Sequence, residues 1–206
     1  MQIISKYFSS LTETQTKQFS MLQDLYNDWN AKINVISRKD IQQLYEHHVL
    51  HSLAIAKFIR FKNGTNILDF GTGGGFPGIP LAILFPECQF TLIDGTGKKV
   101  RVAQEVATTI DLKNVETKHI RGEEEKGKYD FVVSRAVMPL PELIKIVRKN
   151  IAKQQKNVFP NGIICLKGGS LADELKPFLN IVQVAEISNW FTEEWFQTKQ
   201  VVYLPL

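Results

Sequence analysis

The sequence of 206 residues has little cysteine and no long apolar run. No stretch of about 18 or more consecutive apolar residues occurs, so we expect no membrane-spanning helix. The first residues, Met1 to Lys6, lack the basic and apolar regions of a secretory signal. The two cysteines, Cys88 and Cys165, lie far apart, which favours free buried thiols in a reducing compartment over a disulfide framework. These absences predict a cytoplasmic protein with no membrane partner.

A strong excess of charge is also missing, because the formal net charge is only +4. The basic residues are unevenly distributed, however, and residues 145–156 contain no acid. The basic residues of this stripe are Lys145, Arg148, Lys149, Lys153 and Lys156. Such a stripe attracts phosphates at long range, but a solvated helix face has the same pattern. Both interpretations stay open.

The first 63 residues show helical patterns and no strand pattern. Apolar residues three and four positions apart predict a helix over residues 11–35, and Thr12 with Gln15 predicts a capping box at its start. A second helix is predicted over residues 40–60, before the break at Gly64. Two helices without a strand predict an N-terminal helical cap over residues 1–63, followed by a ligand-binding domain over residues 64–206.

From residue 64 onward, short apolar strands alternate with helical patterns. The predicted strands are Asn66–Phe70, Gln89–Ile93, Glu116–Ile120, Tyr129–Ser134 and Ile163–Lys167, and the predicted helices are 78–85, 98–110 and 140–151. The apolar segments Ile181–Ile187 and Gln200–Leu204 are predicted to pair as an antiparallel hairpin. This order predicts an α/β, Rossmann-like fold with a mostly parallel seven-stranded sheet. Ligands bind at the carboxyl ends of the strands in such sheets.

The most informative segment is the glycine-rich stretch that follows the first predicted strand. Gly71, Gly73 and Gly75 allow the backbone to turn sharply and to approach a ligand closely. Counted from Gly73, the stretch matches a dinucleotide fingerprint. Counted from Asp69, it matches the D-x-G-x-G-x-G loop of class I methyltransferases, which bind S-adenosylmethionine.

Two observations favour the methyltransferase interpretation. The carboxylate of Asp69 would repel a pyrophosphate, whereas it would attract a cationic, amine-bearing ligand. Pro77 and Pro80 also stiffen the start of the helix that a pyrophosphate would have to approach.

Acidic residues also follow the second and third predicted strands. Asp94 ends the second strand, where a carboxylate accepts hydrogen bonds from both ribose hydroxyls of an adenosine. A backbone amide and a carboxylate in the segment Arg121 to Glu125 are placed to bind the adenine edge. NAD enzymes use an acid in the position of Asp94 as well, so this residue does not separate the two interpretations.

The turn after the fourth predicted strand, Ser134 to Val137, lacks the residues of two known chemistries. Enzymes that methylate exocyclic amines usually carry an Asn/Asp-Pro-Pro-aromatic stretch here, and methylation of pyrimidine C5 needs a cysteine nucleophile. Neither Cys88 nor Cys165 is well placed. The remaining kind of acceptor is already nucleophilic, such as guanine N7, and needs positioning more than a general base. We therefore predict no certain catalytic residue.

Several cations near these turns are candidates for RNA contacts. Lys98 and Lys99 open the helix after the second strand, where the helix dipole disfavours cations, so a polyanion contact is one explanation. Arg135 would either position the substrate at a phosphate or base edge or support the cofactor pocket. The weaker RNA-binding candidates are Lys98, Lys99, Lys145, Arg148, Lys149 and Lys167.

His47, His48 and His51 resemble a metal cluster at first sight. Their spacing lacks a matching carboxylate or cysteine partner, so we predict no metal site.

The chain resembles the family of ribosomal RNA small subunit methyltransferase G, also called glucose-inhibited division protein B, over essentially its whole length. The segments that carry the resemblance are Trp29-Asn30, Asn34, His48, Ser52-Leu53, Asp69 to Pro80, Asp94, Lys98-Lys99, Ser134-Arg135-Ala136 and Leu166-Lys167-Gly168. The resemblance implies S-adenosylmethionine as cofactor. It implies cofactor contacts at Gly71, Phe76, Gly122, Glu123 and Arg135, to which the loop and ribose arguments add Asp69, Gly73, Gly75 and Asp94.

The resemblance also implies methylation of guanine N7 in the 530 loop of 16S ribosomal RNA. The expected partner is 16S ribosomal RNA or the small ribosomal subunit, bound by a monomer. Three alternatives stay open from the residues alone. They are an NAD-dependent oxidoreductase, a non-catalytic ribosome-binding module on the same fold, and a small-molecule methyltransferase in which the basic stripe is only a solvated face.

Overall fold

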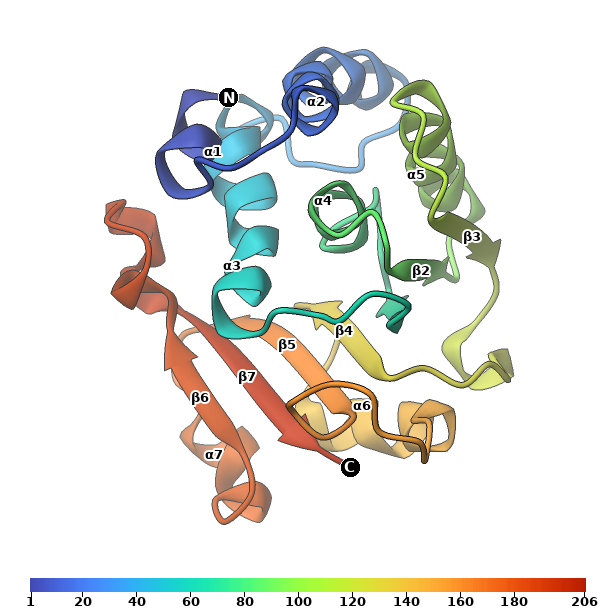
Figure 1. The fold of residues 1–206 in the computed structure, drawn as a ribbon, viewed down its shortest axis with the longest axis vertical. Coiled ribbons are helices and arrows are strands. Elements are labelled where there is room, and N and C mark those ends of the chain that lie inside the picture. Colours follow the sequence, from blue (N-terminus) through green and yellow to red (C-terminus); the bar gives the residue numbers. More distant parts are fainter.

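The computed structural model describes residues 1–206 and contains one seven-stranded sheet in the order β3-β2-β1-β4-β5-β7-β6. The strands are β1 (Asn66–Phe70), β2 (Gln89–Asp94), β3 (Val115–His119), β4 (Phe131–Arg135), β5 (Gly162–Gly168), β6 (Gln183–Glu186) and β7 (Lys199–Pro205). Strands β1 to β5 are parallel, and β7 lies antiparallel between β5 and β6 (Figure 1). The strand order reverses between β1 and β4, so a ligand is expected at their carboxyl ends.

Seven α-helices connect or cover these strands. They are α1 (Gln2–Tyr7), α2 (Glu13–Lys32), α3 (His51–Phe58), α4 (Gly78–Leu84), α5 (Gly97–Thr109), α6 (Leu140–Val147) and α7 (Ala172–Leu175). The predicted capping box is confirmed at the start of α2, because the Gln15 amide donates to Thr12 Oγ1 (3.2 Å) and the Thr12 amide donates to Gln15 Oε1 (3.0 Å).

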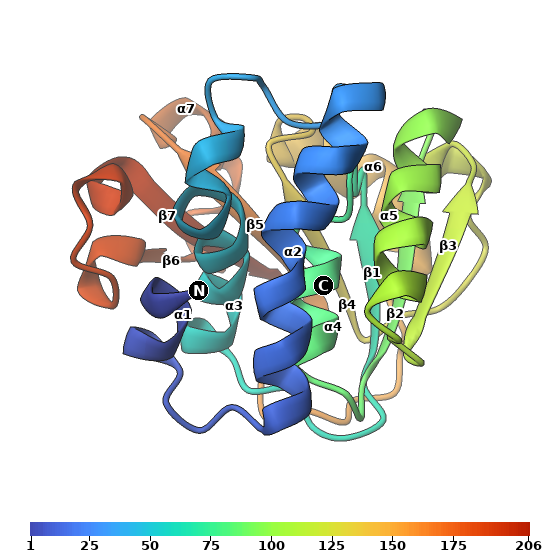
Figure 2. The same cartoon turned by 90° about the horizontal axis from the view of Figure 1, so that it is seen from above.

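Alternate residues of β1, β2, β4, β5 and β7 point into two separate hydrophobic cores, one on each face of the sheet. Ile67 of β1 and Ile164 of β5 join the larger core, which includes side chains of α2, α3, α4 and α5. Leu68 and Ile163 join the smaller core, which includes side chains of α6 and α7. Figure 2 shows α2, α4 and α5 on one side of the sheet and α6 on the other. The predicted Rossmann-like fold with both faces covered is confirmed.

The segment predicted as one regular helix over residues 40–60 is irregular. It begins with a 3-10 turn, η1 (Ile41–Gln43), continues as a π-helical segment, η2 (Leu44–Leu50), and becomes α-helical only in α3. π-helical segments occur often at functional sites because they turn side chains away from their ordinary positions. Here the irregularity places two consecutive histidines above the end of the sheet.

The N-terminal helices bury their apolar face against the same core as the sheet. Phe19, Leu22 and Leu44 are fully buried in the larger core. Tyr7 also donates to the carboxylate of Glu193 (2.8 Å), which lies just before β7. The helical cap is therefore packed into the same core as the sheet.

All seven predicted strands are present, with ends shifted by at most two residues. The short helices α1 and α7 were not predicted, since each has fewer than two full turns in which a hydrophobic period can show. No helix combines the length and the apolar character that crossing a membrane requires.

Candidate functional site

The loop after β1 is held by hydrogen bonds to Asp69, which is fully buried beneath it. Its Oδ2 accepts hydrogen bonds from Thr72 Oγ1 (2.6 Å) and from the Gly78 amide (2.8 Å), so it joins the two ends of the loop. Burial raises the pKa of Asp69 to about 7, although these hydrogen bonds and Arg135 oppose the shift. The sequence predicts that Asp69 faces a cationic ligand, but the structure places it beneath the loop, where it shapes the loop instead.

Three glycines of this loop have backbone conformations that strain other residues. The φ angle is +69° at Gly71, +56° at Gly73 and +108° at Gly75. A side chain on Gly71 would also collide with Val137, because a Cβ atom there would lie 2.5 Å from Val137 Cγ2. Gly75 is buried against Tyr26 and turns the chain without facing open space.

Asp94 connects the glycine loop to the start of α5. Its Oδ2 accepts from the Gly73 amide (2.9 Å) and its Oδ1 accepts from the Thr96 amide (2.8 Å). The side chain is partly exposed, and a carboxylate has about four lone-pair positions. Asp94 therefore retains acceptor capacity for hydroxyl groups of a ligand.

Two adjoining hollows lie at the carboxyl edge of the sheet and share Gly71, Asp94 and Val137. The first hollow, of about 400 Å³, is lined by Phe70, Gly71, Ile93, Asp94, Gly95, Thr96, Ile120, Arg121, Gly122, Glu123, Val137 and Met138. The second hollow, of about 300 Å³, is lined by Val35, Gly71, Thr72, Gly73, Gly74, Phe76, Asp94, Lys99, Arg135, Ala136 and Val137. Thus the loop after β1 and the turn after β4 form the boundary between them.

The first hollow includes Gly122 and Glu123, the residues predicted after the third strand. A Cβ atom on Gly122 would lie 2.0 Å from the ring of Phe70, so only glycine lets the backbone cross this ring. The side chain of Glu123 is exposed at the rim. Apolar walls from Phe70, Ile93 and Ile120 suit a flat aromatic ring.

The second hollow includes Phe76 and Arg135. Phe76 is only 3% exposed and packs on Tyr26, with ring centroids 4.9 Å apart. The Arg135 guanidinium lies 5.1 Å from the Phe76 ring centroid, within cation–π distance. Burial lowers the pKa of Arg135 to about 10, which leaves it protonated at neutral pH. The second hollow therefore contains a permanent cation.

The predicted RNA contacts lie in different surroundings. Lys98 is exposed on the first turn of α5, whereas Lys99 is half-buried in the wall of the second hollow. Lys145 and Arg148 are exposed on α6 and the following turn η4 (Arg148–Asn150). Lys149 donates to the carbonyl of Glu123, next to the first hollow.

Two other basic residues are not available at this edge. Lys167 Nζ pairs with Glu174 (2.7 Å) and donates to the Met138 carbonyl (2.7 Å), and its side chain is only 10% exposed. The geometry therefore argues against the prediction that Lys167 contacts RNA. Lys156, from the same basic stripe as Lys145, lies at the opposite edge, where it pairs with Asp130 (3.4 Å).

The three histidines of the cap are held by an acid and an indole. His47 Nδ1 and His48 Nε2 each contact one carboxylate oxygen of Asp40 at 2.5 Å. The His47 ring stacks on Trp195 at a centroid distance of 4.3 Å, and His51 meets the same indole edge-on.

Sequence reasoning missed Asp40 and Val137. Asp40 precedes the two histidines by seven and eight residues, a spacing of about two helical turns that would place it on their face in the regular helix predicted over residues 40–60. Val137 is 38% exposed although it is large and apolar. Its position directly after Ser134-Arg135-Ala136 was the available signal.

The sequence profile of the family described as rRNA small subunit methyltransferase G matches residues 15–202. The chain belongs to this family. Ribosomal RNA small subunit methyltransferase G of Bacteroides thetaiotaomicron is 66% identical over 203 residues, which cover 98% of each chain. The protein of the same name from Phocaeicola vulgatus is 63% identical over 206 residues, which cover 100% of this chain and 99% of the relative. The chain is thus an S-adenosylmethionine-dependent methyltransferase, as the glycine loop and the resemblance predicted, and the oxidoreductase alternative is not supported.

Solved structures share this fold at low sequence identity. A SAM-dependent methyltransferase from Aquifex aeolicus has a TM-score of 0.56 and 19% identity over 83% of this chain and 100% of that chain. A tRNA (m1A58) methyltransferase from Aquifex aeolicus has a TM-score of 0.55 and 16% identity over 75% of this chain and 68% of that chain. These similarities confirm the fold alone.

Proposed function

We propose that this chain methylates N7 of a guanine in the 530 loop of 16S ribosomal RNA. Small-subunit ribosomal RNA as the substrate is supported by the names of the relatives that are 66% and 63% identical. The 530 loop is supported by the resemblance of the glycine loop and of the Ser134-Arg135-Ala136 turn to the family. Guanine N7 is supported by the chemistry of the site.

The observation that carries the proposal is the pair of hollows that meet at Gly71 and Asp94. The first hollow suits adenine between its apolar walls, with Gly122 and Glu123 at the ring edge. Asp94 suits the ribose hydroxyls. The proposed residues toward S-adenosylmethionine are Gly71, Gly73, Phe76, Asp94, Gly122, Glu123 and Arg135. When bound, the cofactor supplies an electrophilic methyl group on a sulfonium.

The acceptor atom is argued from what surrounds the second hollow. Cys165 lies inside β5, where burial raises its pKa to about 12, and Cys88 lies before β2 at the opposite edge. No thiolate therefore borders the hollows to activate a pyrimidine carbon. Guanine N7 carries a lone pair and no proton, so the residues of the site need only hold the base in line with the methyl group.

RNA would be held by exposed basic residues, with Lys98 at this edge on the first turn of α5 and with Lys145 and Arg148 farther along α6, toward the amino end of β4. Lys98, Lys145 and Arg148 are exposed and lack an acidic partner within ion-pair distance. Phosphate contacts of this kind position RNA without reading its sequence. An unpaired loop suits such a site, because its bases can be turned outward.

The experiment compares small-subunit ribosomal RNA from cells with and without this protein. Chemical cleavage specific for N7-methylguanine should show one modified position, within the 530 loop, only when the protein is present. The purified protein with labelled S-adenosylmethionine should restore that modification on RNA or subunits from the deficient cells. Methyl transfer to another atom or another loop would contradict the proposal. Binding of the subunit with no transfer under any condition would support a non-catalytic module instead.

A further inference from the structure

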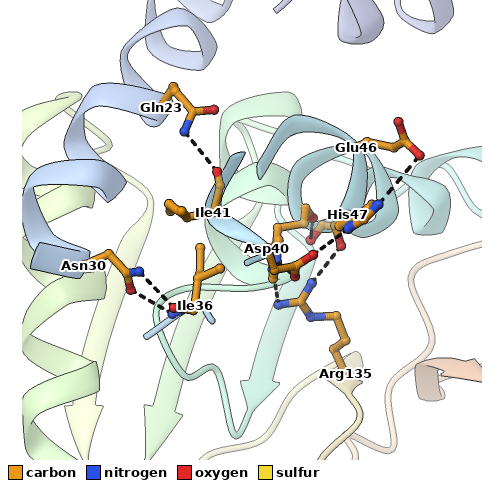
Figure 3. A network of polar contacts seen from close by, with 10 residues as sticks. Gln23, Asn30, Ile36, Asp40, Ile41, Glu46, His47 and Arg135 are labelled. Carbon is orange, nitrogen blue, oxygen red and sulfur yellow. Dashed lines mark hydrogen bonds and ion pairs between the residues drawn. The ribbon is translucent and has the colours of Figure 1, made fainter. Parts of the chain in front are cut away.

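Arg135 is anchored by the N-terminal cap and not by the sheet that carries it. Its Nη1 donates to the carbonyl of His47 (3.3 Å), and its Nη2 contacts Nδ1 of His48 (3.0 Å). Figure 3 shows Arg135 extending from the end of its strand toward Asp40 and His47. The guanidinium has five N–H groups, so three of them have no acceptor in the protein, and the side chain lines the second hollow.

The contact with Arg135 determines the tautomer of His48. A guanidinium has no lone pair to offer, so His48 Nδ1 must be the acceptor and carries no proton. The ring proton is then on Nε2, where it is donated to Asp40 Oδ2 (2.5 Å). Burial and the neighbouring Arg135 charge lower the pKa of His48 to about 4, although Asp40 opposes the shift. His48 is therefore a neutral bridge between an acid and Arg135.

The backbone on either side of Asp40 is held by side chains of the cap. Asn30 accepts from the amides of Val35 and Ile36 (2.9 Å each) and donates to the Ile36 carbonyl (2.8 Å), which fixes the loop before Asp40. Gln23 donates to the carbonyl of Ile41, the residue after Asp40 (3.1 Å). Figure 3 shows both contacts, which involve residues before and after Asp40 in the chain. The cap thus specifies where the carboxylate, and through it the imidazole, can lie.

We infer that His48, oriented by Asp40, is a positioning residue that holds the Arg135 guanidinium toward the carboxylate of S-adenosylmethionine in the second hollow. The inference rests on the proposed function of Arg135 as a cofactor residue. A methionine carboxylate is the anionic end of that ligand, and Arg135 is a half-buried cation of the hollow, which Lys99 also lines. Charge-assisted, bidentate contacts to a carboxylate depend on the orientation of the planar guanidinium. The N-terminal cap would then control cofactor affinity from outside the sheet.

The test uses two substitutions that preserve opposite halves of the imidazole. In His48→Asn, the amide oxygen takes the place of Nδ1 and can still accept from Arg135. In His48→Gln, the amide nitrogen takes the place of Nε2 and can donate to Asp40, but nothing accepts from Arg135. The dissociation constant of S-adenosylmethionine is measured by calorimetry for each purified variant. We expect an increase of at least tenfold for His48→Gln and of no more than about threefold for His48→Asn.

A second ligand separates positioning from general damage to the pocket. 5′-Methylthioadenosine keeps the adenosine but lacks the amino acid end, so it cannot use Arg135 in the inferred way. Its dissociation constant should stay within about twofold of the wild-type value in both variants. Tyr45→Phe serves as the matched control, since it removes a hydrogen bond from the same helical segment to the Phe19 carbonyl (2.8 Å). That control should bind both ligands as the wild type does.

The tautomer offers a readout that is independent of ligand binding. Nitrogen-15 chemical shifts of the His48 ring should show a protonated Nε2 and an unprotonated Nδ1 in the wild type. Asp40→Asn should disturb this pattern and weaken S-adenosylmethionine binding to the level of His48→Gln. Unchanged S-adenosylmethionine affinity in His48→Gln, or an equal loss for both ligands, would overturn the inference. If the wild type itself fails to bind S-adenosylmethionine, the proposed function fails instead.

Discussion

The two ends of strand β1 contain similar residues that serve different purposes. Each end has a glycine with positive φ, Gly64 at +77° before the strand and Gly71 at +69° after it. A Cβ atom on Gly64 would have nothing within 4 Å, whereas one on Gly71 would collide with Val137 between the two hollows. The same backbone conformation is therefore a simple turn at one end and a close approach to a binding site at the other.

Two buried aspartates extend the comparison. At the amino end, Asp130 accepts from the Asn66 amide (2.8 Å) and pairs with Lys156 (3.4 Å). At the carboxyl end, Asp69 leaves Oδ1 without any partner. The carboxylate of Asp130 is paired with a lysine cation and stabilises the fold, whereas the buried oxygen of Asp69 without a partner marks the edge of the candidate site.

The largest expected difference between the two ends concerns the glycines. Gly71→Ala should weaken S-adenosylmethionine binding at least 100-fold, because the new Cβ displaces Val137 at the boundary of both hollows. Gly64→Ala should leave binding unchanged and lower the free energy of unfolding by about 1–2 kcal/mol, the cost of a side chain at positive φ. Calorimetric titration and thermal unfolding measure the two effects. Equal S-adenosylmethionine affinity in both variants would show that the two ends of β1 do not differ in this respect.

The next difference concerns carboxylates. Asp94→Asn should weaken S-adenosylmethionine binding by about 10- to 100-fold, since a hydrogen bond to a charged group contributes about 1.5–3 kcal/mol. Asp130→Asn should lower the melting temperature with no change in the dissociation constant, because its partners Asn66 and Lys156 lie at the opposite edge. A loss of affinity in Asp130→Asn would show that the two edges are coupled.

Acidification should lower the free energy of unfolding through His48, which lies near the carboxyl end of the sheet. The pKa of His48 is lowered to about 4, while an unfolded histidine titrates near 6.5. Between these values the unfolded chain binds the extra proton, so stability is retained above pH 6.5 and is lost as pH falls toward 4. The expected loss from this residue is about 1 kcal/mol per pH unit between pH 6 and 5.

The variant His48→Asn isolates this contribution, because the other groups with shifted pKa values titrate in both proteins. His51, whose pKa burial also lowers, acts in the same direction, whereas Asp69, whose pKa burial raises, acts in the opposite one. The stability advantage of the wild type over His48→Asn should therefore shrink as pH falls. An advantage that stays constant from pH 6.5 to 5 would mean that folding does not shift the pKa of His48.

The smallest expected effect concerns lysines at the two edges. Lys98→Gln should weaken RNA binding about threefold at moderate salt and reduce the slope of log affinity against log salt by about 1. Lys156→Gln should change neither quantity and should lower the melting temperature, because it leaves Asp130 without its cation. Filter binding across a salt series measures the slope. Equal slopes for wild type and Lys98→Gln would remove Lys98 from the RNA surface.

The sequence was sufficient to predict the elements that follow from a local pattern of residues. The strands follow from apolar runs, the start of α2 follows from Thr12 and Gln15, and the loop after β1 follows from its glycine spacing. The location of Gly71 and Asp94 at one edge could be predicted because each lies at the carboxyl end of a parallel strand, and topology alone brings these ends together.

The contacts between distant segments could not be predicted in the same way. The bridge from Asp40 through His48 to Arg135 joins residues 87 positions apart, and the π-helical turn that aims the histidines has no clear sequence pattern. Lys167 looked like an available cation because its partner Glu174 belongs to a short helix that periodicity does not reveal. Such pairings depend on packing between elements, which a single sequence does not specify.

The position of β7 between β5 and β6 has a consequence for biosynthesis. Strand β6 emerges from the ribosome before β7 but has no other neighbour in the sheet. Until residues 199–205 arrive, the long edge of β5 with Ile163, Ile164 and Leu166 stays open to other chains. Open apolar edges of this kind favour aggregation of nascent proteins. The nascent chain is thus expected to depend on chaperones until β7 has been synthesised.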